Sequence, residues 1–240
     1  MINLAPPVLP TKTHKLVIVG AGEFGDIAYQ YFTYDSTYEV VAFAVEREFI
    51  KEQTCNRLPV VALEELASLY PATTHHAHVA VTFTHLNQVR ERLYGLCKTQ
   101  GYTMANYISS RAFVWHTVTL GDNLFVFEHN TVQHGCTIGN GVVLWSGNHI
   151  GHQTVIEPFA YVSSHVVVSG YCTLGARSFI GVNATFADHI KLAPDSFVAM
   201  GAFVARSIET PNTVVKNIDG IAKSSDKVSA MRYMKVPNAA

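Results

Sequence analysis

The sequence predicts an N-terminal Rossmann-like α/β domain followed by a left-handed parallel β-helix built from hexapeptide repeats. In the first half, a buried-strand pattern runs into a glycine-rich turn and then a helical pattern. In the second half, an apolar residue recurs every six positions from Ile108 to Val204. The expected boundaries are an N-terminal tail over 1–13, the α/β domain over 14–105, the β-helix over 106–215 and a C-terminal tail over 216–240.

Composition excludes several classes of function. The 240 residues carry 17 Lys and Arg against 18 Asp and Glu, so no charge excess favours nucleic acid or an anionic membrane. No apolar run approaches the ~18 residues of a spanning helix, so no membrane insertion is expected. Only 15% of residues are charged, which indicates that much surface is hidden in a repeat or an oligomer. The four cysteines form no close pair, as expected of reduced thiols in a cytoplasmic protein.

The glycine turn is the first candidate site. The strand 15–19 enters Gly20-Ala-Gly22-Glu-Phe-Gly25, and a second strand, 38–45, ends at Glu46. Glycines let the backbone approach a pyrophosphate, and the helix that follows offers unpaired N–H groups. The pattern therefore favours nucleotide binding, with Glu46 placed to meet a ribose or base. The alternative is a turn that only packs a helix on a strand.

The rest of the α/β domain is expected to add two strands. Residues 63–69 and 88–100 have helical patterns, and residues 77–83 and 102–108 have strand patterns. Together these segments predict a small parallel sheet of about four strands.

The six-residue period predicts the β-helix. All 17 positions counted by sixes from Ile108 are apolar, and 16 of them are aliphatic. The residue two places before each of them is mostly small or apolar, so both side chains point to the same face of a short strand. Three such strands close a coil of 18 residues, and stacked coils bury a continuous apolar column.

Residues 18 apart stack at about the inter-strand spacing, ~4.8 Å. His116, His134 and His152 are spaced by 18 and should form a row on one outer corner, with Gly170 as its next member. A histidine there could act as a general base. A zinc site like that of the gamma-class carbonic anhydrases would use His129 and His134, but its third ligand position falls on Leu93, outside the β-helix. The remaining alternative is a set of solvated corner residues.

These motifs resemble the bacterial sugar acyltransferases of the sialic-acid O-acetyltransferase and amino-sugar N-acetyltransferase family. The likeness covers about residues 15 to 215 and is strongest over 144–152, 163–170 and 179–184. It implies that His152 is the catalytic base and that the N–H of Gly170 polarises the acetyl carbonyl. It also implies a homotrimer with acetyl-CoA in the groove between subunits. The implied contacts are Tyr161, Val182 and Met200 for acetyl-CoA, and Gly20, Gly22, Glu23, Phe24 and Glu46 for the nucleotide sugar.

Three departures from the family pattern bear on the site. Gln153 stands where the family often has an acid after the catalytic histidine. Val45 and Glu46 stand where it usually has paired aspartates, and Glu23-Phe24 where it often has Gly-His.

The resemblance implies an acetyl-CoA-dependent acetyltransferase acting on a nucleotide-linked amino sugar for a surface polysaccharide, such as a lipopolysaccharide O-antigen, without a metal ion. The alternatives are O-acetylation of a sugar hydroxyl and a non-catalytic nucleotide-sugar-binding β-helix protein. The glycine turn would also fit a dehydrogenase, but the β-helix that follows it would not.

Overall fold

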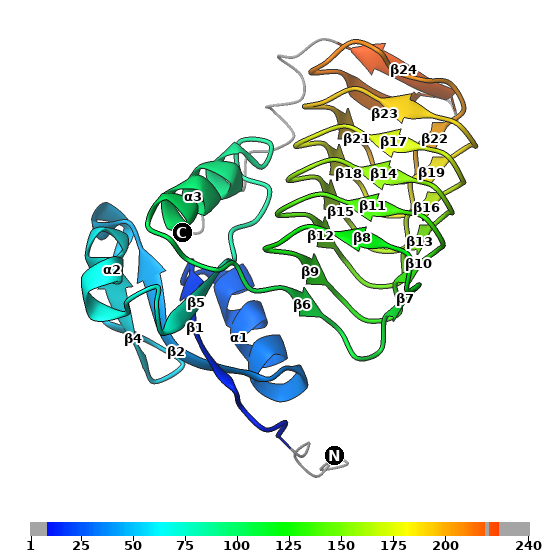
Figure 1. Ribbon diagram of the computed structural model, residues 1–240. Helices are drawn as coiled ribbons and strands as arrows, with labels where there is room; N and C mark the ends of the chain where they lie inside the picture. Colours follow the sequence, from blue (N-terminus) through cyan, green and yellow to red (C-terminus); the bar gives the residue numbers. More distant parts are fainter. Residues whose placement is uncertain (1–8, 219–220, 226–240) are drawn as a thin grey trace, which may run out of the picture. The chain divides into compact units, whose positions relative to one another are not determined.

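The computed structural model describes residues 9–218 and 221–225 (Figure 1). The chain divides into two compact units. An α/β unit comprises Met1–Val81 and Leu93–Tyr107, and a β-helix unit comprises Thr82–Arg92 and Ile108–Ala240. The segment Thr82–Arg92 therefore groups with the β-helix, which the sequence did not predict.

The α/β unit contains a five-stranded sheet in the order β3-β4-β2-β1-β5. Its parallel strands are β1 (His14–Val19), β2 (Tyr38–Val45), β4 (Leu58–Ala62) and β5 (His75–Val79), and β3 (Thr54–Cys55) pairs antiparallel with β4. The helices are α1 (Glu23–Asp35), α2 (Leu66–Leu69) and α3 (Gln88–Thr99), with 3-10 turns at Arg47–Phe49 and Leu63–Glu65. The first turn of α3 groups with the β-helix unit.

Local sequence explains the centre of this sheet. Leu16 to Val19 are fully buried in β1, and α1 begins after Gly22 with Ala28 and Phe32 facing inward. The parallel strands follow the order third, second, first and fourth along the chain, which is also the order in the first half of doubly wound dinucleotide-binding sheets.

Two expectations for this sheet were wrong. The strand β4 was not predicted, because Pro59 weakens its pattern. Residues 102–108 form no full strand: Ala77 and Met104 make an isolated bridge, and pairing resumes only at Tyr107. The apolar run there reflects burial of side chains such as Tyr102 and Met104.

The β-helix unit is a stack of coils with three parallel sheets (Figure 1). The β6 sheet contains β6 (Tyr107–Ile108), β9 (Phe125–Val126), β12 (Val143–Leu144), β15 (Tyr161–Val162), β18 (Phe179–Ile180) and β21 (Phe197–Val198). The β7 sheet contains β7 (Phe113–Val114), β10 (Thr131–Val132), β13 (His149–Ile150), β16 (Val167–Val168), β19 (Thr185–Phe186) and β22 (Phe203–Val204). The β8 sheet contains β8 (Thr119–Leu120), β11 (Thr137–Ile138), β14 (Val155–Ile156), β17 (Thr173–Leu174) and β20 (Lys191–Leu192).

Each of the 17 predicted hexad positions is the second residue of one of these two-residue strands. Strands 18 residues apart pair in register, as in His149 with Val167. Inward residues such as Ile150, Ile156 and Val162 are fully buried and form one apolar column. The predicted parallel β-helix is thus confirmed, and its coils are consistent with the expected left-handed winding.

The β6 sheet continues past the last hexad. β23 (Val214–Ile218) pairs parallel with β21, and β24 (Ile221–Ser225) pairs antiparallel with β23. The sequence predicted a tail from residue 216, because the six-residue period stops at Val204. The hairpin satisfies backbone groups that the last coil would otherwise leave at an open sheet edge.

Residues 82–92 lie on the outer face of the β6 sheet. The Phe83 ring contacts the rings of Tyr161 and Phe179, with centroids 5.2 and 4.8 Å apart. The Arg90 side chain is fully buried and donates to three backbone carbonyls, those of Gly141 (3.0 Å), Phe159 (2.7 Å) and Thr82 (3.2 Å). Burial lowers the pKa of Arg90 to about 10. This segment therefore belongs to the core of the β-helix unit.

Candidate active site

The predicted histidine row lies along one corner of the β-helix. We call His116, His134, His152, Gly170 and Asp188 the histidine corner, because each residue leads from a strand of the β7 sheet to one of the β8 sheet. The N–H of Gln153 donates to the carbonyl of His134 and that of Tyr171 to the carbonyl of His152, each over 2.9 Å. Neighbouring members therefore stack one coil apart, and all three histidines are exposed.

The three histidines differ in their surroundings. Nδ1 of His134 lies 2.8 Å from the Thr117 hydroxyl, which holds that ring. The ring of His152 instead lies over Gly170 of the next coil. A Cβ at Gly170 would lie 2.6 Å from Cε1 and 2.8 Å from Nε2 of His152, so the missing side chain makes room for the imidazole. Among the described residues, His152 thus differs from His134 in having no side-chain hydrogen bond to its ring, and it is the histidine of the row whose ring lies over a glycine.

Gln153 does not take over the role of the missing acid. Its side-chain amide lies over Gly135 of the preceding coil, where a Cβ would come within 2.5 Å of Nε2. The His152 ring points to the following coil. The backbone N–H of His152 is held by Oε1 of Gln133 over 3.0 Å. The ring of His152 is therefore oriented by other residues.

Gly170 is already engaged in a hydrogen bond. Its N–H, the expected donor to the acetyl carbonyl, donates to Oδ1 of Asp188 over 2.9 Å. Asp188 follows Gly170 by 18 residues, so the coil length that predicts the histidine row could also have identified it. An acyl oxygen can accept this hydrogen bond only if the carboxylate moves away.

The residues expected to contact acetyl-CoA do not lie together. Tyr161 is only 3% exposed, since Phe83 and Phe179 cover its ring, and burial raises the pKa of Tyr161 to about 12. Its side chain therefore offers no surface to a ligand, and we remove it from the candidate site. Val182 and Met200 are exposed and stacked on a different corner, between the β6 and β7 sheets. We call this pair the Met200 corner.

The glycine turn has one open position. A Cβ at Gly20 would lie 2.5 Å from the Ala80 carbonyl oxygen, and one at Gly25 would lie 2.1 Å from the Gly20 carbonyl oxygen. Both are therefore required for packing. A Cβ at Gly22 would meet no atom within 4 Å, and Gly22 has an ordinary φ of −87°. Only Gly22 leaves open space at the start of α1, where a phosphate would approach.

The two candidate acids, Glu23 and Glu46, lie at the carboxyl edge of the sheet, near the glycine turn. Gly20 N–H donates to the Ala44 carbonyl over 2.8 Å, so the turn lies beside the end of β2, where Glu46 follows. Glu23 is exposed in the first turn of α1. Phe24 is only 4% exposed, so its side chain packs inside and does not meet a substrate.

Sequence reasoning missed a cation near the turn. Nδ2 of Asn56 donates to Oδ1 of Asp26 over 2.7 Å, which ties the β3–β4 hairpin to the first turn of α1. Arg57 follows Asn56 and is exposed. Arg57 was not identified from the sequence because the β3–β4 hairpin that carries it was not predicted.

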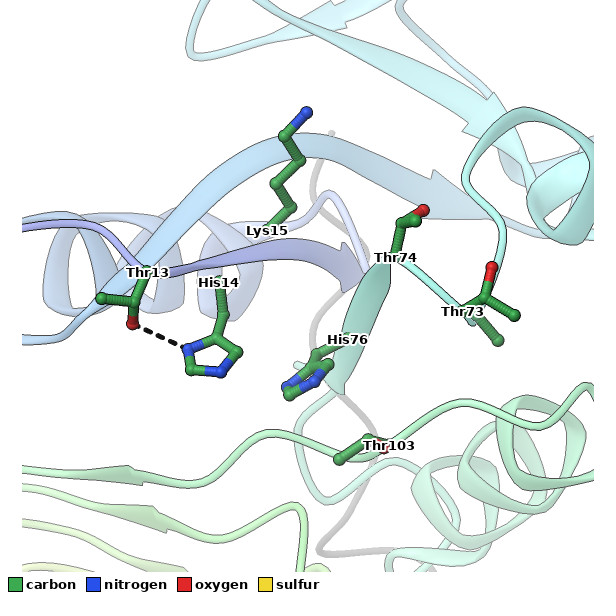
Figure 2. Close-up of a pocket in the computed structure, with 8 residues that line it drawn as sticks. Thr13, His14, Lys15, Thr73, Thr74, His76 and Thr103 are labelled. Atoms are coloured by element: carbon green, nitrogen blue, oxygen red, sulfur yellow. Dashed lines mark hydrogen bonds between the residues drawn. The ribbon is translucent and has the colours of Figure 1, made fainter.

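A separate pocket of about 450 Å³ lies in the α/β unit (Figure 2). Thr13, His14, Lys15, Ala72, Thr73, Thr74, His76 and Thr103 line it. The rings of His14 and His76 lie 5.0 Å apart, and burial together with the nearby His14 lowers the pKa of His76. This pocket is at the amino ends of β1 and β5, so it is not the predicted nucleotide site, which is at the carboxyl ends.

The side chains and helices of residues 9–218 and 221–225 bear on metal binding and membrane insertion. Within these ranges, no group of three or more His, Cys, Asp or Glu side chains could hold a metal ion. No helix in the same part of the chain is long and apolar enough to cross a membrane.

No known family profile matches the sequence. Among curated proteins, a UDP-N-acetylglucosamine O-acyltransferase of Aliivibrio fischeri, which uses acyl-[acyl-carrier-protein], is 30% identical over 63 residues, or 26% of this chain and 24% of that protein. A UDP-3-O-acylglucosamine N-acyltransferase of Bordetella avium is 29% identical over 98 residues, or 39% of this chain and 27% of that protein. The matches span only about a quarter of these relatives' length.

Solved structures cover far more of the chain. Perosamine N-acetyltransferase from Caulobacter crescentus, in complex with CoA and GDP-perosamine, matches 91% of this chain and 99% of its own, with a TM-score of 0.77 and 19% identity. The acetyltransferase domain of PglB from Neisseria gonorrhoeae, in complex with acetyl coenzyme A, matches 88% of this chain and 99% of its own, with a TM-score of 0.76 and 24% identity. The predicted resemblance to bacterial sugar acyltransferases is confirmed at the level of the fold.

Proposed function

We propose that this chain is an acetyl-CoA-dependent acetyltransferase for a nucleotide-linked amino sugar, with His152 as its general base. The observation that carries the proposal is the exposed His152 ring over the side-chain-free Gly170, on a fold shared with enzymes that bind CoA. An imidazole is well suited to accept a proton near neutral pH.

The reaction would be a direct transfer. The amino nitrogen of the sugar attacks the thioester carbonyl of acetyl-CoA, and His152 takes a proton from that nitrogen. The C–S bond then breaks, and the imidazolium returns the proton to the departing CoA sulfur. A donor to the carbonyl oxygen would stabilise its developing negative charge. Gly170 N–H fills this role once Asp188 has moved away.

The acceptor is proposed to be held by its nucleotide at the glycine turn. Open space at Gly22 and the N-terminus of α1 suit the phosphate or diphosphate of a nucleotide sugar, and Arg57 lies on the adjoining hairpin. The Caulobacter neighbour takes a GDP-linked sugar. The carrier of this chain's substrate could be UDP, dTDP, GDP or CMP, and the product would serve a surface polysaccharide.

A homotrimer with shared active sites is part of the proposal. His152 lies between the β7 and β8 sheets, whereas the Met200 corner lies between the β6 and β7 sheets. In the proposed trimer, the His152 corner of one chain and the Met200 corner of a neighbouring chain border one groove, so that a single acetyl-CoA contacts both. The outer β7 face carries exposed Phe113, Val167 and Phe203, which suits burial against a second copy.

A thiol-release assay with acetyl-CoA tests the activity across a panel of 3- and 4-amino nucleotide sugars. We expect acceptor-dependent release of CoA with at least one amino sugar. Release with hydroxyl acceptors alone would favour O-acetylation.

A non-catalytic nucleotide-sugar-binding protein is the second candidate. It is favoured by the hydrogen bond that engages Gly170 N–H and by the position of Gln153 away from the His152 ring. Nucleotide-sugar binding without CoA release from any acceptor would support it.

A further inference from the structure

We infer that Tyr171 is the positioning residue for His152 and takes the place of the acid that Gln153 replaces. The inference rests on the proposed function, in which His152 is the base. Its structural basis is the contact between the two rings, which lie 5.0 Å apart between centroids and at 87° to each other. This edge-to-face geometry is the favourable arrangement for two aromatic rings.

The His152 ring is confined from two directions. Gly170 lies beneath the imidazole, close enough that any Cβ there would clash with it. Tyr171 closes a second side of the ring. Within the described chain the imidazole forms no side-chain hydrogen bond, so these contacts determine its orientation.

Tyr171 is itself held in place. Its ring stacks flat on that of His189, with centroids 4.9 Å apart and an interplanar angle of 1°. The backbone adds a ladder, in which Tyr171 N–H donates to the His152 carbonyl (2.9 Å) and His189 N–H to the Gly170 carbonyl (3.0 Å). Rings from three successive coils thus support one another on the histidine corner.

The core does not explain this tyrosine. Its side chain is 52% exposed and sits at a corner position with a φ of 58°, where a bulky residue is uncommon. In this β-helix, left-handed corner positions also carry bulky side chains, but Phe159 is only 5% exposed and Arg177 pairs with Asp195 over 2.7 Å, so packing or an ion pair accounts for them. An exposed aromatic ring against His152 is therefore better explained by a role in the site.

The test compares Tyr171→Leu, which removes the ring, with Tyr171→Phe, which keeps it. Tyr34→Leu is the matched control, because Tyr34 is an exposed tyrosine on α1. In full-length protein labelled with 13C at histidine Cε1, the His152 signal is assigned by its loss in His152→Asn. The kcat and the KM for acetyl-CoA are measured on the same samples.

We expect Tyr171→Leu to move the His152 signal and to lower kcat by about 10- to 100-fold, since misplacing a catalytic group by about 1 Å can cost about 10²-fold. The KM of Tyr171→Leu for acetyl-CoA should stay within about twofold of the wild-type value. Tyr171→Phe and Tyr34→Leu should keep both kcat and this KM within about twofold of wild type. An unmoved signal, or full kcat in Tyr171→Leu, would overturn the inference. Absence of transfer by wild type would instead contradict the proposed function. The nuclear Overhauser effect between the His152 Cε1 proton and the Gly170 α protons, present in wild type and lost in Tyr171→Leu, would still show whether Tyr171 holds the ring over Gly170.

Discussion

Gly170 donates its backbone N–H to the carboxylate of Asp188, one coil further along the histidine corner. Asp122 and Asn140 form the same kind of bond on another corner, with an N–H···Oδ1 distance of 3.1 Å. The interaction is thus a general way to cap a corner N–H in this β-helix. At Gly170 it competes with the proposed role of that N–H in catalysis.

Replacing Asp188 tests this competition. Asp188→Ala frees the Gly170 N–H from a hydrogen bond to a charged group worth about 1.5–3 kcal/mol, and we expect kcat/KM for acetyl-CoA to rise by up to about tenfold. Asp188→Asn is the matched control, because Asn140 shows that an amide oxygen caps such an N–H. The kcat/KM of Asp188→Asn for acetyl-CoA should change less than that of Asp188→Ala. Steady-state kinetics that show a tenfold loss in Asp188→Ala, with its fold intact, would contradict the competition between the carboxylate and the acyl oxygen.

Gly22→Val tests the nucleotide site. Its Cβ meets no neighbour, so the fold should survive while the added bulk hinders the phosphates of a nucleotide sugar. We expect calorimetry with UDP, dTDP, GDP and CMP sugars to show binding weakened at least tenfold, and acetyl-CoA binding unchanged. Glu46→Ala should weaken the same sugars more mildly, by about 1–3 kcal/mol.

Gly95→Val is the control for the glycine change, because its Cβ is equally open and it lies on α3, away from the turn. Nucleotide-sugar affinity equal to wild type in Gly22→Val would mean that the glycine turn serves packing alone.

Arg90→Met tests whether residues 82–92 are part of the β-helix core. The change removes the donors that satisfy three backbone carbonyls in a fully buried site. We expect a loss of about 2–5 kcal/mol in the free energy of unfolding. Arg90→Lys should lose less, since it keeps the charge without the planar fork. Urea titration at fixed protein concentration measures both, and an unchanged midpoint in Arg90→Met would refute this view.

Sedimentation tests the trimer. Wild type should sediment at about three times the 26.4 kDa chain mass. Val167→Glu places a charge on the exposed apolar β7 face and should release monomers. Thr173→Glu, on the β8 face, should remain trimeric. A wild-type monomer at all concentrations would contradict both the trimer and the shared active site.

The features that sequence predicts well here are local or periodic. The hexads specify all 17 short strands because each repeat carries its own inward apolar residue, and the coil length then places His152 against Gly170. Burial of Tyr161 could not be predicted, because it depends on Phe83, far away in the sequence. The coil length places Asp188 next to Gly170, but whether its carboxylate accepts the Gly170 N–H depends on side-chain direction, which spacing does not determine.

The most direct test of the account is the mass of the acceptor after incubation with acetyl-CoA. The acceptor is the amino nucleotide sugar that releases CoA fastest. With wild type, we expect it to gain one acetyl group that resists hydroxylamine, as an amide does and an ester does not. The rate should fall by about 10²- to 10⁴-fold in His152→Ala, the usual contribution of a general base, and change little in His134→Ala. Acetylation at the wild-type rate by His152→Ala, or no acetyl gain on any acceptor, would contradict the account.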